Sequence, residues 1–219
     1  RVRPEERHRD ETLESDDAEA ILEYLRKYEY GSVEHVLISL LWETGIRLGA
    51  AQSIDLVDID LAKEKIELEH RPEQGTTLKN GQSGERPVAI SAEMADLIDN
   101  YIEKTRSDVV DDNDREALFT TVYGRMHENT MRRMVYRVTA PCYRGEECPN
   151  HNESETKCPE AASPHAVRRG SITHFLTNDI PVEIVSDRMN VSRKILDKHY
   201  DKRSKEVKLE QRRQYLDNI

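Results

Sequence analysis

One short stretch of strand-like sequence, set between long helical segments, constrains the fold of this chain more than any other feature. Residues 56–69 (LVDIDLAKEKIELE) alternate and turn as a β-hairpin does. Residues 80–84 (NGQSG) then form a turn, and residues 86–91 (RPVAIS) have the pattern of a third short strand. Because the rest of the chain is mostly helical in pattern, we predict one mainly α domain with a small three-stranded antiparallel sheet, which is an α+β fold.

Apolar residues at helical spacing predict helices on both sides of this sheet. The first covers residues 18–30, where Asp16 or Asp17 caps the start and Gly31 breaks the helix. The next is apolar enough to be buried and ends at Gly45. The predicted helices lie at residues 18–30, 33–45, 92–106, 129–139, 164–177, 181–188, 192–199 and 203–216.

The two ends of the chain differ from its middle. Residues 1–15 are charged throughout and are expected to form a disordered or linker-like lead without the apolar region of a signal peptide. We expect one domain over residues 16–203, with a Cys/His-rich loop at 141–162, and a basic C-terminal helix or tail at 204–219. No apolar run approaches the ~20 residues that a membrane helix needs, so we expect a cytoplasmic protein. The absence of an initial Met indicates a fragment or a processed chain.

The chain is acidic, with a formal net charge of −10 and a pI of about 5.4. This balance argues against a nucleic-acid binder, which is usually basic. However, charged residues make up 35% of the chain, and acidic ones crowd surface-like segments such as the expected exposed loop at 111–116. Such a composition also fits a protein kept soluble in concentrated salt, where the Debye length at 1 M is about 3 Å and a local arginine cluster still binds DNA. An ordinary acidic cytosolic domain remains the alternative.

Four side chains have the chemistry needed to bind a phosphate and transfer a proton. His165 and Arg168 are three residues apart, so they share one helix face and can converge on an anion. Arg47 follows the helix-ending Gly45, and its planar fork makes bidentate, permanently charged contacts to phosphate oxygens. Lys79 enters a glycine-containing turn, where a movable amine can donate a proton. Each has a plain structural alternative, such as a solvated hairpin lysine or a core histidine.

These residues, followed by Tyr200, resemble the catalytic domain of the tyrosine recombinase (phage integrase) family. The resemblance rests on ETGIRLGA around Arg47, TTLKNGQSGERP around Lys79, SPHAVRRG around His165 and Arg168, and VSDRMNVSRKILDKHY ending at Tyr200. It covers about residues 16–203, and with the acidic composition it suggests a haloarchaeal type. The family's separate N-terminal core-binding domain is not in this sequence, so an isolated catalytic domain is expected.

The resemblance implies a site-specific recombinase or integrase that cleaves and rejoins DNA. Tyr200 would attack the scissile phosphorus and form a 3′-phosphotyrosine link. His165 would take the tyrosine proton or orient a phosphate oxygen, and Lys79 would protonate the leaving 5′-oxygen. Arg47 and Arg168 would stabilise the charge that develops on the phosphate. No cofactor enters this chemistry, and Tyr215 is a distant second candidate for the nucleophile.

The same resemblance implies double-stranded DNA as the partner and a homotetramer assembled on it. Four further arginines are candidates for contacts with the DNA backbone. They are Arg86, Arg169, Arg188 and Arg193.

Two positions depart from the family pattern. The family usually has Glu or Asp three residues after the first arginine, where this chain has Ala50. Asp55 could compensate, or the arginine could be less well fixed. The family's hydrogen-bonding His or Trp near the tyrosine falls on Val191 here, and its Gly falls on Asn190, which could donate a hydrogen bond instead.

All three cysteines lie in one loop together with a histidine. Cys142, Cys148, His151 and Cys158 could hold a structural zinc tetrahedrally, with no open position for a substrate. An odd number of cysteines in a cytosolic chain argues against a disulfide framework. Three free thiols in a flexible insertion are the alternative.

Three other functions remain open at this point. The two departures motivate a DNA-binding module on the recombinase fold that has lost cleavage. A type IB topoisomerase is the nearest enzymatic alternative, and it would relax supercoils as a monomer. An acidic, zinc-stabilised interaction protein would bind no DNA at any salt concentration.

Overall fold

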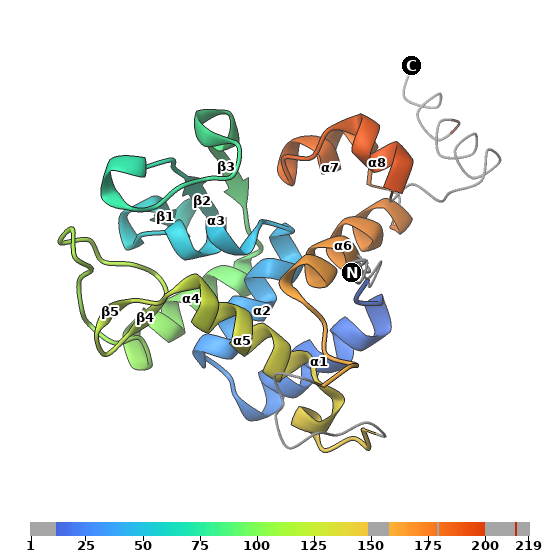
Figure 1. The fold of residues 1–219 in the computed structure, drawn as a ribbon, viewed down its shortest axis with the longest axis horizontal. Coiled ribbons are helices and arrows are strands. Elements are labelled where there is room, and N and C mark those ends of the chain that lie inside the picture. The colour runs from blue at the N-terminus through green and yellow to red at the C-terminus, as the bar shows by residue number, and fades with distance from the viewer. Residues whose placement is uncertain (1–11, 149–157, 179, 200–212, 214–219) are drawn as a thin grey trace, which may run out of the picture.

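The computed structural model describes residues 12–148, 158–178, 180–199 and 213. In Figure 1 the three-stranded sheet and the α7–α8 pair stand side by side above a body of helices. The helices are α1 (Ser15–Tyr28), α2 (Val33–Thr44), α3 (Leu48–Ser53), α4 (Ala92–Lys104), α5 (Glu128–Thr139), α6 (Pro164–Thr177), α7 (Val182–Arg188) and α8 (Arg193–His199). The strands are β1 (Ile59–Asp60), β2 (Lys65–Leu68), β3 (Arg86–Ala89), β4 (Thr120–Thr121) and β5 (Gly124–Arg125). Short 3₁₀ turns lie at Leu56–Asp58, Leu61–Lys63, Pro72–Gln74, Gly81–Gly84 and Pro141–Arg144.

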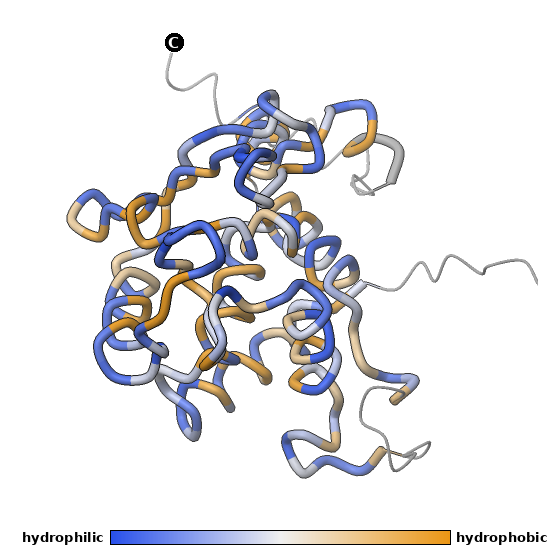
Figure 2. The backbone as a smooth tube through the Cα atoms, turned by 60° about the vertical axis from the view of Figure 1, so that its left-hand side comes forward, coloured by the Kyte–Doolittle hydropathy of each residue, from blue (hydrophilic) through white to orange (hydrophobic). Residues whose placement is uncertain are grey.

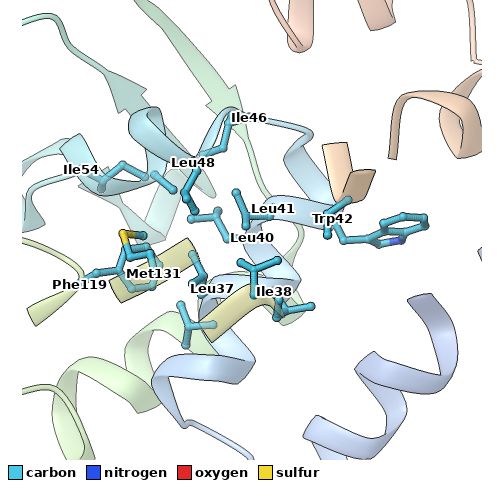
Figure 3. Packing of buried hydrophobic residues seen from close by; sticks show 14 of the residues in the cluster. Leu37, Ile38, Leu40, Leu41, Trp42, Ile46, Leu48, Ile54, Phe119 and Met131 are labelled. Atoms are coloured by element: carbon cyan, nitrogen blue, oxygen red, sulfur yellow. The ribbon is translucent and has the colours of Figure 1, made fainter. Parts of the chain in front are cut away.

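The helix α2 is the centre of the molecule, because it is apolar on most of its surface. It contacts α1, α4, α5 and α6. Ser32 caps its start by accepting a hydrogen bond of 3.0 Å from the His35 backbone N–H. Figure 3 shows the apolar side chains of α2 packed into one core with Leu48 of α3, Met131 of α5 and Phe119, which directly precedes β4. Figure 2 shows hydrophobic segments running through this body, with hydrophilic residues on the outer loops.

The sheet has the order β1-β2-β3, and both pairs are antiparallel. Ile66 on β2 lies opposite Val88 on β3, and both side chains are buried together with Leu68. Alternate residues point away from the core, as the period of a strand requires. The sheet therefore has one face on the helices and presents the connection between β2 and β3, residues 69–85, at the edge of the helical body.

Two hydrophobic clusters meet at α6. Its first turns contribute Ala166 and Val167 to the large core, whereas Ile172 and Leu176 belong to a small cluster. The small cluster also contains Val185, Met189, Val191 and Leu196. At Gly170, between the two sets, a Cβ would lie 2.1 Å from the Leu13 carbonyl oxygen and 2.8 Å from the Trp42 ring. The absence of a side chain at this position lets α6 approach α2 closely.

Buried ion pairs fasten the residues around the sheet. The Asp55 side chain is 3% exposed and pairs with Arg71 at 3.2 Å, with Arg115 at 3.3 Å and with Arg125. Asp58 pairs with Arg71 and accepts a hydrogen bond of 2.9 Å from the Asp55 backbone N–H. The network joins the start of the sheet to the loop before β4, because each arginine comes from a different segment.

The sequence predicted the mainly α fold with its three-stranded antiparallel sheet, and the structure confirms both. The first helix starts earlier than expected, since Glu14 is its N-cap and Asp16 and Asp17 lie in its first turn. The short pair β4–β5 was not expected.

The expected acidic loop at 111–116 is only partly exposed. The Asp111 carboxylate is 8% exposed and pairs at 2.9 Å with both Arg115 and Arg125. The helix expected at 203–216 lies outside the described residues apart from residue 213, which is helical. Within the described ranges, no helix combines the length and the apolarity needed to cross a membrane.

We expect Asp55→Asn to lower the free energy of unfolding by about 3–5 kcal/mol, because it leaves three arginines with no opposing charge at this position. The free energy is measured by urea unfolding. The m value, which is the slope of the unfolding free energy against urea concentration, should stay unchanged. Asp60→Asn is the matched control: Asp60 pairs with Lys63 at 2.9 Å, but the two side chains are 33% and 73% exposed. Equal effects of the two substitutions would contradict a special role for the buried network.

Candidate active site

An open cleft of about 780 Å³ lies between the sheet, α5, α6 and the α7–α8 turn. Segments far apart in the sequence line it: the start of α3, the loop before β3, the middle of α5, the start of α6, and the turn after α7. Its lining residues include Arg47, Lys79, Arg86, Arg132, His165 and Arg168. The cleft is therefore strongly cationic, although the whole chain is acidic.

Arg168 forms the floor of the cleft and is 6% exposed. It lies on the second turn of α6, whose start is fixed by Pro164 and by Ser163, which accepts a hydrogen bond of 3.1 Å from the Ala166 N–H. Its guanidinium donates to the Gly45 carbonyl oxygen and, at 2.8 Å, to the Met189 carbonyl oxygen. Arg168 therefore links the end of α2, α6 and the α7–α8 turn.

Arg47 is the N-cap residue of α3, with an extended backbone. Gly45 ends α2 in the left-handed conformation (φ 59°), so the chain turns and presents Arg47 at the cleft. The suggestion that Asp55 supports Arg47 in place of an acid at Ala50 is wrong, because Asp55 pairs with arginines 71, 115 and 125 instead. Ala50 lines the cleft and provides no charge.

Lys79 and Arg86 both line the cleft. Lys79 lies in the loop before β3, and Arg86 is the first residue of β3. Lys79 is exposed and lies beside the 3₁₀ turn Gly81–Gly84. Arg86 is half-buried and donates to the carbonyl oxygens of Arg188 and Gly84, both at 2.9 Å. Burial and then the charge of Arg47 lower the pKa of Arg86 to about 10. Arg86 thus contributes positive charge to the cleft and also fastens the loop.

His165 lies at the mouth of the cleft on the first turn of α6. Its pKa is lowered from the ordinary value of 6.5 by loss of surrounding water and then by Arg169, Arg168, Lys79 and Arg47. The imidazole is therefore neutral at pH 7 and able to accept a proton.

The other predicted DNA-binding arginines have different surroundings. Arg193 lines a second hollow that continues from the cleft, and it pairs with Glu183 at 3.4 Å in a largely exposed ion pair. Arg169 is one of the cations that lower the pKa of His165. Arg188 donates to the Glu43 carbonyl oxygen at 3.1 Å and lies over the Phe175 ring. It is not among the described residues that line the cleft, and these two contacts tie α7 to the end of α2 and to α6.

The turn after α7 replaces the polar contact expected there with an apolar one. Val191 lines the cleft, but its side chain is 8% exposed and belongs to the small hydrophobic cluster. Asn190 also lines the cleft, with both ends of its amide hydrogen-bonded to the loop before β3. A phosphate in this cleft would therefore find no hydrogen-bond donor in the Val191 side chain.

The sequence did not indicate that α5 forms one wall of the cleft. Glu128, Arg132 and Tyr136 line this wall, one helical turn apart, and Arg132 pairs with Glu128. The spacing itself is readable in the sequence as one face of a helix. However, nothing local shows that this face meets residues of α3 and α6.

Tyr200 and His151 lie outside the described residues. α8 ends at His199, one residue before Tyr200 in the sequence. Of the predicted zinc ligands, the Sγ atoms of Cys148 and Cys158 are 3.2 Å apart. Cys158 is buried in a third hydrophobic cluster, with Ala140 and Ala161, and Cys142 and Cys148 pack against that cluster. Among the residues that the structure describes, no three ligand side chains form a group able to hold a metal.

Comparisons with known proteins give one family and one fold. The family model described as "Phage integrase family" matches residues 11–206. The solved structure of XerA recombinase aligns with a TM-score of 0.64 and 18% identity, over 94% of this chain and 64% of that chain. The Tn1549 transposon integrase in complex with transposon right end DNA aligns with a TM-score of 0.65 and 16% identity, over 100% of this chain and 67% of that one.

A lambda integrase dimer bound to a COC′ core site is a further match, with a TM-score of 0.57 and 15% identity. It covers 89% of this chain and 49% of that chain. The chain thus spans about two thirds of the solved chains of XerA recombinase and of the Tn1549 integrase, and about half of the solved chain of lambda integrase. At these identities, the likeness concerns the fold.

We expect the pKa of His165 in the DNA-free protein to lie below 6.5, with the imidazole charging only as the pH falls through that lowered value. Arg169→Ala removes one of the cations that lower it, so the pKa of His165 should rise toward 6.5. An NMR titration of the histidine ring protons measures both values. Arg133→Ala, an exposed arginine on α5, is the control and should leave the pKa of His165 unchanged. A pKa above 6.5 in the unchanged protein would contradict the assignment.

Proposed function

This chain belongs to the phage integrase family, and from that premise we propose that it is a site-specific DNA recombinase. It would cleave and rejoin DNA through a 3′-phosphotyrosine intermediate. The proposed catalytic domain spans residues 16–203, with the lead before it and the tail after it outside that unit. The observation that carries the proposal is the convergence of Arg47, Lys79, His165 and Arg168 on one cleft from three separate segments: the start of α3, the loop before β3, and α6.

The arrangement supports a distinct part for each side chain in the first cleavage step. The Tyr200 oxygen attacks the phosphorus while the bond from phosphorus to the 5′-oxygen breaks. His165, neutral at pH 7, accepts the tyrosine proton, and Lys79 donates a proton to the departing 5′-oxygen. Another strand's 5′-hydroxyl reverses the step and joins the strands. The chemistry needs no cofactor, because the phosphotyrosine retains the energy of the phosphodiester bond.

The two arginines differ in how they are held, which supports different contributions to phosphate binding. Arg168 is buried and bonded to two carbonyl oxygens, so its position is fixed before a phosphate arrives. Such preorganised charge lowers the barrier because no reorganisation is needed as the transition state forms. Arg47 is held by its place at the start of α3, without an acid at position 50. Arg86 adds charge at the same wall.

The proposed partner is double-stranded DNA. Four copies of the chain would assemble as a homotetramer on paired DNA sites, in the cytoplasm. The cationic cleft supports a phosphate-contacting surface whose affinity falls as salt rises. A haloarchaeal type is a finer part of the proposal, and composition supports it through the net charge of −10 and the 35% of charged residues. The assays below are therefore run in both low and molar KCl.

A binding module without cleavage activity is the alternative that the structure favours most. The Val191 side chain packs in an apolar cluster, and Ala50 places no carboxylate beside Arg47. Such a module would bind DNA and form no covalent link. A type IB topoisomerase would form the link but relax supercoiled DNA as a monomer, without paired sites.

We expect the chain to form a denaturant-resistant adduct with a nicked suicide DNA substrate, and Tyr200→Phe to abolish it, because the ring then lacks the attacking oxygen. The substrates come from DNA that flanks the coding sequence, and the adduct is measured by denaturing gel electrophoresis. Tyr215→Phe is the matched control and should retain the adduct. Loss of the adduct in Tyr215→Phe but not in Tyr200→Phe would reassign the nucleophile, and binding without an adduct would favour the inactive module.

The structural zinc also remains a proposal, supported by ligand spacing and by the proximity of Cys148 and Cys158. We expect about one zinc per chain after purification and dialysis, measured by mass spectrometry of the metal. Cys158→Ser should lose it, and Cys158 is the buried member of the three. Chain purified from zinc-replete cells with no bound metal would contradict the proposal.

A further inference from the structure

The turn between α7 and α8 is fastened to the loop before β3 by one amide side chain. Asn190 donates through Nδ2 to the Ser83 carbonyl oxygen at 3.2 Å. Its Oδ1 accepts from Asn80 Nδ2 at 3.1 Å. Both ends of the Asn190 amide are therefore used to hold a segment more than a hundred residues away in the sequence.

The backbone at Asn190 favours glycine. Its φ is +46°, in the left-handed region that side-chain-bearing residues seldom adopt. Glycine would satisfy this backbone without strain. Asparagine is one of the few residues with a side chain that tolerate this region, and here its side chain adds the pair of hydrogen bonds to the loop, which glycine could not make.

The loop lies directly against this amide. A Cβ placed on Gly84 would be 3.5 Å from Asn190 Nδ2. A second link runs parallel to the first, from Arg86 Nε to the Arg188 carbonyl oxygen at 2.9 Å. The loop is thus held at its tip by Asn190 and at its entry to β3 by Arg86.

The link joins two segments that carry proposed catalytic residues, the loop with Lys79 and the turn that leads toward Tyr200 in the sequence. Lys79 directly precedes Asn80, and its own side chain is exposed. The turn at Asn190 leads into α8, which ends one residue before Tyr200 in the sequence. Fastening the loop to the turn therefore ties the segment that carries Lys79 to the turn from which α8 starts.

We propose that Asn190 is a positioning residue that clamps the Lys79 loop to the α7–α8 turn, so that proton donor and nucleophile reach the phosphate together. The proposal rests on the proposed recombinase function for its catalytic consequence, but the clamp itself does not. Both bonds are solvent-exposed, so the effect is expected to be smaller than that of removing Lys79 itself.

The first measurement tests the clamp without any DNA. In Asn190→Gly the backbone is relaxed and both bonds are lost, so the variant should fold normally while the loop opens more often. Hydrogen exchange should become about tenfold faster at the Gly81 and Glu85 amides, which are bonded within this loop. Asp114→Gly is the control: Asp114 also has a positive φ (+56°), is exposed, and lies away from the cleft. Unchanged exchange in Asn190→Gly would overturn the clamp.

The second measurement tests what the clamp does for the chemistry. The second substrate is DNA in which sulfur replaces the bridging 5′-oxygen at the cleavage site. The sulfur leaves as a thiolate and needs no proton donor, because a free thiol has a pKa of about 8.5. With the ordinary oxygen substrate, Asn190→Gly should slow adduct formation about tenfold, and Lys79→Ala should slow it about a hundredfold or more. With the sulfur substrate, the rate of adduct formation by both variants should approach the rate of the unchanged protein.

The outcomes separate this inference from the function on which it rests. Equal slowing of Asn190→Gly on both substrates would overturn the positioning of Lys79, since the defect would then lie in binding or in the nucleophile. Unchanged rates on both would overturn it as well. If the unchanged protein formed no adduct with either substrate, the recombinase proposal would fail, and hydrogen exchange would still decide whether the clamp exists.

Discussion

The buried guanidinium of Arg168 is the interaction on which the site depends. Taking a permanent charge out of water is costly unless hydrogen bonds compensate for the lost hydration. Two carbonyl oxygens do so here, those of Gly45 and Met189, and each belongs to a segment that carries another part of the cleft. The need to satisfy one cation therefore brings the end of α2 and the α7–α8 turn to α6. Gly45 is suited to this position because a Cβ there would lie 2.7 Å from the Met189 sulfur.

Local patterns in the sequence predicted much of the fold and the order of the site residues. The helices followed from apolar spacing, the end of α2 followed from Gly45, and the sheet followed from alternation at residues 56–69. The grouping of His165 with Arg168 followed from helix geometry alone. What escaped prediction depends on which surfaces meet: Asp55 turns to arginines 71, 115 and 125, and Arg188 bonds to Glu43 instead of facing the cleft. A residue's type does not reveal its partner when that partner is distant in the chain.

The charge of the chain is distributed unevenly, and this explains how a chain with a negative net charge can have a positively charged cleft. Several carboxylates neutralise arginines inside the protein, as Asp55, Asp58 and Asp111 do around the sheet. Many cations gather at the cleft, although Arg132 pairs with Glu128 there, and burial followed by the charge of these neighbours lowers the pKa values of Arg86 and His165. A concentrated positive field at one place can attract a polyanion even when the total charge is negative.

Two of the hydrophobic clusters among the described residues, the large core and the small cluster, meet at α6, and such a division allows two levels of cooperativity. The small cluster joins the later turns of α6 to α7 and α8, and few apolar side chains hold it. Such a unit can unfold on its own at a lower free energy than the large core, so the global stability of the protein does not measure the stability of the part that leads to Tyr200. Natural variation that weakens this cluster would therefore change how often α7 and α8 are docked on α6, with little effect on the melting temperature of the large core.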